Sequence, residues 1–311
     1  MSPRWSSLPT GFSSGLASRL PIIGDIWRDE LRVLVQPHQL VLTRLSGWRK
    51  TRVVYEDVIA VVRQSSVHSE SNTPGMVNGV PPTPWQAALH QLAVTMRDAQ
   101  WQGCQPRVIL SNHFVRYVLI PWNTSLSKPD EQRAFVRHCF TQAYGEPARQ
   151  WDIRTSAAGY GKPSMASGVE PDLLQALRLC FAEAGMHLQN IHPLMMQAIN
   201  ETRRQLGKQT KSQQAEKSLC LAVLEQGRLA VLLQQNNDWR SLQCHAASID
   251  ALPALIQRDA IISGLESDHW PLVVYNAEPG MPRLNITGRK LHQLSREIPF
   301  LRQPDLAKVA S

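Results

Sequence analysis

The sequence lacks the patterns that mark zinc proteins, disulfide-rich secreted proteins and membrane-spanning proteins. Its five cysteines are odd in number and contain no CxxC pair, so buried free thiols are expected and a zinc site or disulfide framework is not. A membrane helix needs about 18 or more consecutive apolar residues, and no such run occurs. The N-terminal residues also lack the apolar core of a signal peptide, so the expected location is cytoplasmic.

Common enzyme motifs are absent as well. The sequence contains no GxxxxGKS/T, GxGxxG, HExxH or GxSxG. The trio Ser111, Asn112 and His113 could supply a nucleophile and a base, but these residue types are typical of a turn. The ten histidines include no i,i+4 pair on a helix. We therefore predict no catalytic residue, no cofactor and no metal, and expect that the protein is not an enzyme.

The charge balance favours acidic partners. Lys and Arg exceed Asp and Glu by 33 to 25, which gives a net charge of +8. Nucleic acid, anionic lipid and acidic protein segments all suit such a chain. The basic residues are scattered, with no run of five or more, so nucleic acid is not the expected partner. A basic nucleic-acid-associated protein stays open as an alternative.

The first part of the chain follows a strand-rich pattern. After a flexible arm at residues 1–24, β-rich runs at 31–35 and 40–45 flank a short turn, and a third run at 52–62 completes a meander. A helix follows, with Thr83 as the predicted cap and Gln86 as its capping-box partner. Two further strands are predicted at 108–110 and 115–120, so the first half is predicted as βββ–α–ββ.

The middle of the chain is predicted to be an inserted region at about residues 127–190. Helices are expected to open at Pro129 and Pro171, with a strand at 150–155 and a connecting loop at 156–168 between them. A third helix follows Ile191. The polar residues 207–217 then indicate a linker.

The opening pattern returns after this linker. β-rich runs at 219–224 and 229–233 flank a second turn, and a strand (239–245), a helix (249–265) and a strand (271–275) follow. Aligning Val35 with Leu224 superimposes the two hairpins at an offset of 189 residues. The same order of elements twice predicts a duplicated unit.

This duplicated order resembles the actin-like ATPase superfamily, and more narrowly the PilM-type pilus proteins and the cytoplasmic part of GspL-type secretion proteins. The segment from Ala184 to Asn200 carries the resemblance, because it steps from a glycine through a short strand into a helix before the second half. The resemblance implies an α/β fold of duplicated actin-like (ribonuclease H-like) βββαβ halves, with a helical insertion in the first half. The halves would be residues 25–206 and 218–311.

The resemblance also allows a test for nucleotide chemistry. An ATP-hydrolysing member needs a turn with Asp, Gly and small residues after the first strand of each half. The first such turn here contains Gln36, Pro37 and His38, and the second contains Glu225 and a single glycine. The late segment that would contact adenosine, at residues 276–280, places one glycine beside a proline. We therefore expect no ATP hydrolysis and no cofactor, and weak nucleotide binding stays open.

By resemblance, the protein is a non-catalytic cytoplasmic scaffold of a pilus or type II secretion-like assembly platform. It would bind an inner-membrane partner of the PilN or GspM type in a groove of its first half, and would be peripheral to the membrane through that partner. A homodimer stays open. The main alternative is a nucleotide-binding ATPase or kinase relative with degenerate loops.

One surface is a candidate for partner binding. The sequence has nine Trp, and an exposed aromatic beside Arg is a good interface anchor. Trp122, with Arg116 on the strand before it and Arg137 on the helix after it, is the predicted surface. Packing of Trp122 in the core is the alternative.

Overall fold

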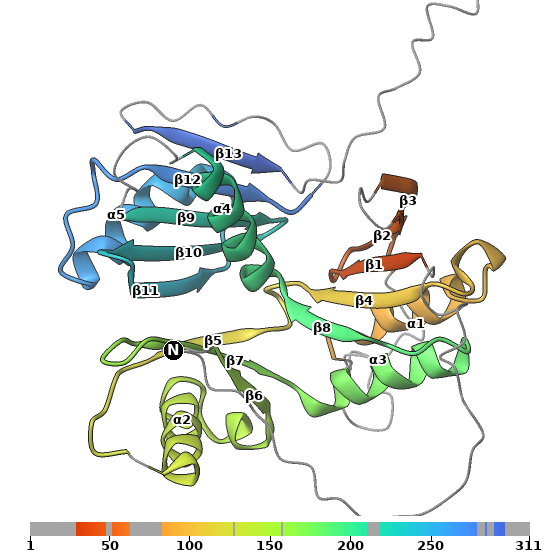
Figure 1. Cartoon of the computed structure of the whole chain (residues 1–311), viewed down its shortest axis with the longest axis horizontal. Coiled ribbons are helices and arrows are strands. Elements are labelled where there is room, and N and C mark those ends of the chain that lie inside the picture. Colours follow the sequence, from red (N-terminus) through yellow and green to blue (C-terminus); the bar gives the residue numbers. More distant parts are fainter. Residues whose placement is uncertain are drawn as a thin grey trace, which may run out of the picture.

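The structure is a computed structural model that describes residues 29–47, 52–62, 83–126, 128–156, 158–209, 218–278, 284 and 289–295. Within these ranges the chain forms two five-stranded sheets and one three-stranded sheet, with helices packed against them (Figure 1). The predicted arm at residues 1–24 lies outside the described residues, and so does the predicted linker from residue 210 onward.

The first sheet has the strand order β3-β2-β1-β4-β8. Strands β1, β2 and β3 form the predicted antiparallel meander, and β4 and β8 run parallel to β1. The bounds are Glu30–Val35 (β1), Gln39–Ser46 (β2), Arg52–Ala60 (β3), Gln105–Leu110 (β4) and Asn190–Pro193 (β8).

Two helices lie on one side of this sheet, α1 (Gln86–Thr95) and α3 (Pro171–Glu183) (Figure 1). Gln86 Oε1 accepts a hydrogen bond from the Thr83 N–H at 3.2 Å, as the predicted capping box requires. Thr83 is not the cap itself, because the N-cap position is Trp85, which makes no side-chain capping bond. The sequence thus located this helix but placed its cap two residues early.

The second sheet repeats the order of the first, as β11-β10-β9-β12-β13. Its meander is antiparallel, and β12 and β13 run parallel to β9. The bounds are Leu219–Glu225 (β9), Arg228–Gln235 (β10), Asp238–His245 (β11), Leu272–Asn276 (β12) and Leu291–Ser295 (β13), with α5 at Leu252–Ile262. Strand β13 was not predicted from the sequence.

The third sheet distinguishes the first half from the second. It has the order β5-β7-β6 and is fully antiparallel. Its strands are Arg116–Ile120 (β5), Asp152–Thr155 (β6) and Ser164–Val169 (β7), and α2 (Pro129–Tyr144) packs against it. The predicted strand at 115–120 is β5, which pairs with β7, so this sheet spans residues 116–169 where the sequence had suggested an insertion at 127–190.

The predicted loop at 156–168 was wrong in its second part, which is strand β7. Small residues such as Ser and Gly dominate this strand and hide its β pattern. Their size has a packing reason, because a Cβ at Gly168 would lie 2.7 Å from Phe140 Cε1 and 3.1 Å from Trp151 Cε3. The short 3₁₀ helices are Ala99–Trp101, Glu146–Gln150 and Ile249–Ala251.

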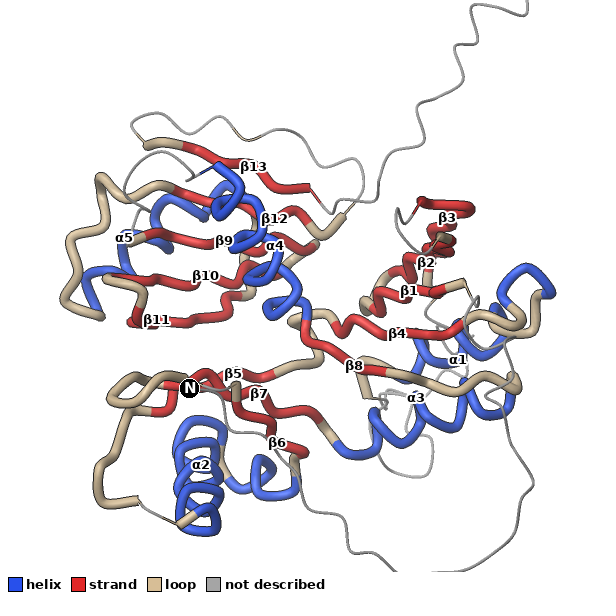
Figure 2. Tube along the Cα trace, in the orientation of Figure 1, coloured by secondary structure: helices blue, strands red, loops and turns tan. Residues whose placement is uncertain are grey.

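A continuous core joins the two halves. Alternate residues of β9 point to opposite faces, so Cys220 and Ala222 pack with α5, while Leu221 and Val223 join the core of the first half. Helix α4 (Leu194–Gln209) runs from the end of β8 to the second sheet (Figure 2). Burial on both faces explains why β9 is a continuous apolar run in the sequence.

Candidate functional site

The strand ends that would hold a nucleotide in an actin-like ATPase meet one another at the junction of the two halves. The turn after β1 carries Gln36, and the segment after β4 carries Ser111 and Asn112. From the second half come Glu225, the last residue of β9, and Glu278, which follows β12.

Glu225 is the centre of this junction. Its side chain accepts a short hydrogen bond from the Ser111 hydroxyl, a 2.9 Å bond from the Asn112 N–H and a 3.4 Å bond from Gln36 Nε2. Glu225 is only 2% exposed. A buried carboxylate is costly unless it is hydrogen-bonded, and here all three donors come from the other half of the chain.

Glu278 makes the complementary contacts. It accepts a short hydrogen bond from the Gln226 N–H and a 3.4 Å bond from Gln36 Nε2, and its Oε1 lies 3.3 Å from His38 Nε2. Gln36 therefore bridges both carboxylates of the second half.

The two carboxyl groups differ in pKa. Burial raises the pKa of Glu225, and the hydrogen bonds from Ser111, Asn112 and Gln36 offset this only in part. Burial also acts to raise the pKa of Glu278, but the bonds from His38, the Gln226 N–H and Gln36 outweigh it, so that the pKa of Glu278 is lowered.

The junction follows the internal duplication. Gln36 and Glu225 are separated by the 189 residues of the hairpin alignment, so they are equivalent residues of the two halves. The strand registers pair Val35 with Leu110 and Leu224 with Asn276, which makes Asn112 and Glu278 equivalent as well. Each half therefore contacts the other through the same two equivalent positions, Gln36 and Asn112 in the first half and Glu225 and Glu278 in the second.

A phosphate site requires free backbone N–H groups, and the first turn offers few of them. The Gln36 N–H donates to the Gln39 carbonyl within its own turn at 3.0 Å, and Pro37 has no N–H. Side chains thus join the two turns at the place where glycine backbone would approach a phosphate.

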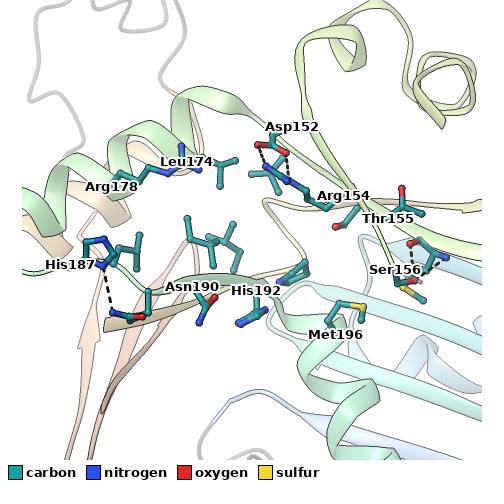
Figure 3. Close-up of a pocket in the computed structure, with 18 of the residues that line it drawn as sticks. Asp152, Arg154, Thr155, Ser156, Leu174, Arg178, His187, Asn190, His192 and Met196 are labelled. Atoms are coloured by element: carbon teal, nitrogen blue, oxygen red, sulfur yellow. Dashed lines mark hydrogen bonds and ion pairs between the residues drawn. The ribbon is translucent and has the colours of Figure 1, made fainter. Parts of the chain in front are cut away.

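A groove of about 720 Å³ lies in the first half. It runs between the third sheet and the segment that carries β8, so we call it the edge-strand groove (Figure 3). Strands β6 and β8 both border it, and each is the last strand of its sheet. Its lining residues are Leu110, Asp152, Arg154, Thr155, Ser156, Met165, Ser167, Val169, Leu174, Arg178, Ala182, Met186, His187, Leu188, Gln189, Asn190, Ile191, His192, Pro193 and Met196.

The edge-strand groove has an apolar floor and a polar rim. Leu174 and Arg178 of α3 lie across from His192 of β8 (Figure 3). Arg154 pairs with Asp152 at 2.8 Å. Burial, reinforced by the charge of Arg107, lowers the pKa of His192, so that its imidazole is neutral at pH 7.

The residues predicted as a partner surface are only partly brought together. Trp122 and Arg137 line a second groove of about 510 Å³, which we call the Trp122 groove. Trp122 is 43% exposed, so it is not a core residue. Arg116 is not among the lining residues, and it donates a 2.9 Å hydrogen bond to the His113 carbonyl.

The fold and the junction define a duplicated actin-like architecture, as the sequence predicted. No protein-family model and no curated protein sequence matches the chain. Solved structures do match. The cytoplasmic domain of EpsL, an inner-membrane component of the type II secretion system of Vibrio cholerae, matches with a TM-score of 0.53 and 11% identity over 86% of this chain and 90% of that one.

The PilM–PilN type IV pilus biogenesis complex matches with a TM-score of 0.52 and 12% identity, over 85% of this chain and 88% of the matched chain. The predicted resemblance to PilM-type and GspL-type proteins is therefore confirmed at the level of the fold.

Sequence reasoning missed the central role of Glu225 and the edge-strand groove. A signal for Glu225 was present, because the hairpin alignment already set it opposite Gln36. The groove had no such signal, since strand β7 and the three-strand sheet were not predicted. Among the described residues, no group of three or more His, Cys, Asp or Glu could hold a metal ion, and no helix there is long and apolar enough to cross a bilayer.

Proposed function

We propose that this chain is a non-catalytic scaffold of a bacterial pilus or type II secretion-like assembly platform, whose edge-strand groove binds a short extended segment of an inner-membrane partner. The observation that carries the proposal is that β6 and β8, each the last strand of its sheet within the described residues, both border the same groove. The partner would be of the PilN or GspM type, and would recruit the cytoplasmic scaffold to the inner membrane.

Open strand edges favour an extended peptide. The last strand of a sheet presents backbone N–H and C=O groups that no neighbouring strand satisfies. A peptide that adds to such an edge gains main-chain hydrogen bonds, and pockets for its alternate side chains give specificity. Two such strands border this groove, so a bound peptide has backbone partners on both sides.

The lining of the groove suits apolar anchors. Met165, Met186 and Met196 all line it, and the flexible thioether side chain adapts to different partners. Arg178 adds a positive charge on the rim, at an exposed position of α3. A segment with alternating apolar side chains and an acidic residue would fit this chemistry.

The junction of the halves supports a role without catalysis. A nucleotide phosphate between the turns would have to displace Gln36 from Glu225 and Glu278. It would then lie beside two carboxylates, which repel an anion. No observation favours the alternative of an ATPase or kinase relative.

Site-specific photo-crosslinking tests this proposal in cells. A benzoylphenylalanine at Ala182, an exposed groove position on α3, is expected to crosslink to the cytoplasmic terminal segment of an inner-membrane protein. Gln175 is exposed on the same helix and is not among the lining residues, so the same probe there is expected to give no such product.

A blocking substitution sharpens the test. Ala182→Trp fills the groove without touching the core and should abolish co-purification of the crosslinked partner, whereas Gln175→Trp should leave it unchanged. Crosslinks that form equally from both positions, or only to soluble proteins, would contradict the proposal.

A further inference from the structure

We propose that the Trp122 groove is a second docking surface, which binds a short acidic protein segment with an aromatic or aliphatic anchor. The third sheet would then hold two partner segments on opposite faces of β6. This inference does not depend on the occupant of the edge-strand groove.

Strand β6 separates the two grooves. Asp152 and Arg154 line the edge-strand groove, while Ile153 between them lines the Trp122 groove. This is the alternation expected of a strand whose faces are both in use. Thr155 and Ser156, at the end of β6, line both grooves, so the two grooves adjoin there.

The floor of the Trp122 groove is apolar. Ile153, Phe135 and Val136 are partly buried and pack on the small core of the third sheet, yet all three line the groove. They offer an anchoring surface for one or two apolar side chains.

Two exposed aromatic rings stand beside this floor. Trp122 and Tyr160 make an edge-to-face contact with 4.8 Å between ring centroids, although Tyr160 is 87% exposed. Paired aromatic rings that remain exposed, next to an apolar floor, are typical of binding anchors and would not be needed for core packing.

The charged side chains in the described lining of the groove are all basic. Its described lining includes Arg133, Arg137 and Lys162 and no Asp or Glu. Arg133 and Lys162 pair with carboxylates just outside the lining, at Asp130 and Asp238. Arg137 instead donates to the backbone carbonyls of Arg149 and Trp151, and no Asp or Glu of the described residues pairs with it.

This combination favours a protein segment over nucleic acid. Single-stranded nucleic acid is bound by a basic track along the backbone with aromatic platforms for successive bases. Here one cation, Arg137, has no acidic partner within the described part of the chain, and the floor is aliphatic as much as aromatic. An acidic amphipathic segment satisfies both the floor and Arg137.

Peptide display tests the inference. A library of random 12-residue peptides is selected on the full chain and counter-selected on the Trp122→Ala/Arg137→Ala double variant. We expect enriched peptides with net negative charge and at least one Trp, Phe, Leu or Ile. A synthetic enriched peptide should bind at least tenfold more weakly to Trp122→Ala or Arg137→Ala, measured by fluorescence anisotropy.

Arg178→Ala is the matched control, since it removes the same charge from the edge-strand groove and should leave this binding unchanged. Thermal unfolding of each variant separates lost binding from lost folding, and Trp122 is exposed enough that the variant should fold. No enrichment, enriched peptides of basic character, or binding insensitive to Trp122→Ala would overturn the inference. Trp122-dependent binding of a labelled oligothymidylate without any peptide enrichment would assign the groove to nucleic acid instead.

Discussion

The two halves of the molecule share one sheet order but place different residues at the turn after their first strand. The first half has Gln36, an amide that donates, and the second half has Glu225, a carboxylate that accepts. The duplication makes these two positions equivalent. If the two halves had the same sequence, two identical side chains would be in contact here. The difference turns a symmetric contact into a donor–acceptor pair, so the residues in which the two turns differ are the ones that join them.

The halves differ again in the chain that leaves β4 and β12. The first half inserts the third sheet before its fifth strand, and both grooves border that sheet. The second half continues from β12 to β13, which pair directly. The candidate binding surfaces thus belong to the half that carries the addition.

Restoring symmetry at the turn should have the largest effect. Gln36→Glu would place a third carboxylate within reach of Glu225 and Glu278, at a position that is 0% exposed. We expect a loss of about 3 kcal/mol in the free energy of unfolding near neutral pH, since buried like charges disfavour the ionised form. Urea denaturation followed by circular dichroism measures it.

The matched control for Gln36→Glu is Gln226→Glu, which adds the same charge at an exposed position of the second turn. Its cost should stay below about 0.5 kcal/mol. Equal effects at both positions would mean that the contact between the turns contributes nothing specific.

A smaller effect is expected from damage confined to the added sheet. Gly168→Ala would force a Cβ to within 2.7 Å of Phe140 Cε1, and overpacking of this kind costs about 1–3 kcal/mol. Hydrogen exchange should then quicken in β5, β6 and β7 but stay unchanged in β9 and β10. Gly159→Ala in the exposed connection between β6 and β7 serves as the control, since its Cβ would meet only the Lys162 side chain, at an ordinary contact distance of 3.5 Å.

The two carboxylates of the junction should respond to pH in opposite directions. The pKa of Glu225 is raised above its ordinary value of 4.5, so its contribution to stability is fully present below pH 4.5 and falls as pH rises through the folded-state pKa. The pKa of Glu278 is lowered from the same value, so its contribution is present above pH 4.5 and is lost as pH falls through the folded-state pKa.

Two isosteric variants measure this opposition. Glu225→Gln should cost more at pH 4 than at pH 7.5, whereas Glu278→Gln should cost more at pH 7.5 than at pH 4, each with a difference of about 1 kcal/mol or less. Denaturant titrations at the two pH values provide the comparison, and parallel profiles for the two variants would refute it.

The sequence predicted the repeated elements except β13, and it predicted β5, α2 and β6 of the added region but missed β7 and the sheet that these strands form. Apolar runs such as β9 and capped helices such as α1 carry local signals, and the hairpin offset of 189 residues survives in the Gln36–Glu225 contact. Strand β7 carries no such signal, because Gly168 is small to accommodate Phe140. The edge-strand groove depends on where two sheets place their last strands, and no single segment encodes that.

Nucleotide addition should have the smallest effect of all. A ligand with a dissociation constant of ~10 µM, present at ~1 mM, would stabilise the folded chain by about 2.7 kcal/mol and raise its melting temperature by several degrees. Because Gln36 contacts both Glu225 and Glu278 at the place of the phosphates, we expect Mg·ATP to leave the melting temperature unchanged within about 1 °C. A clear rise in melting temperature that Gln36→Glu abolishes would contradict this prediction. It would mean that the two turns separate to admit a nucleotide, and that the residues in which the turns differ control a binding site that both halves still share.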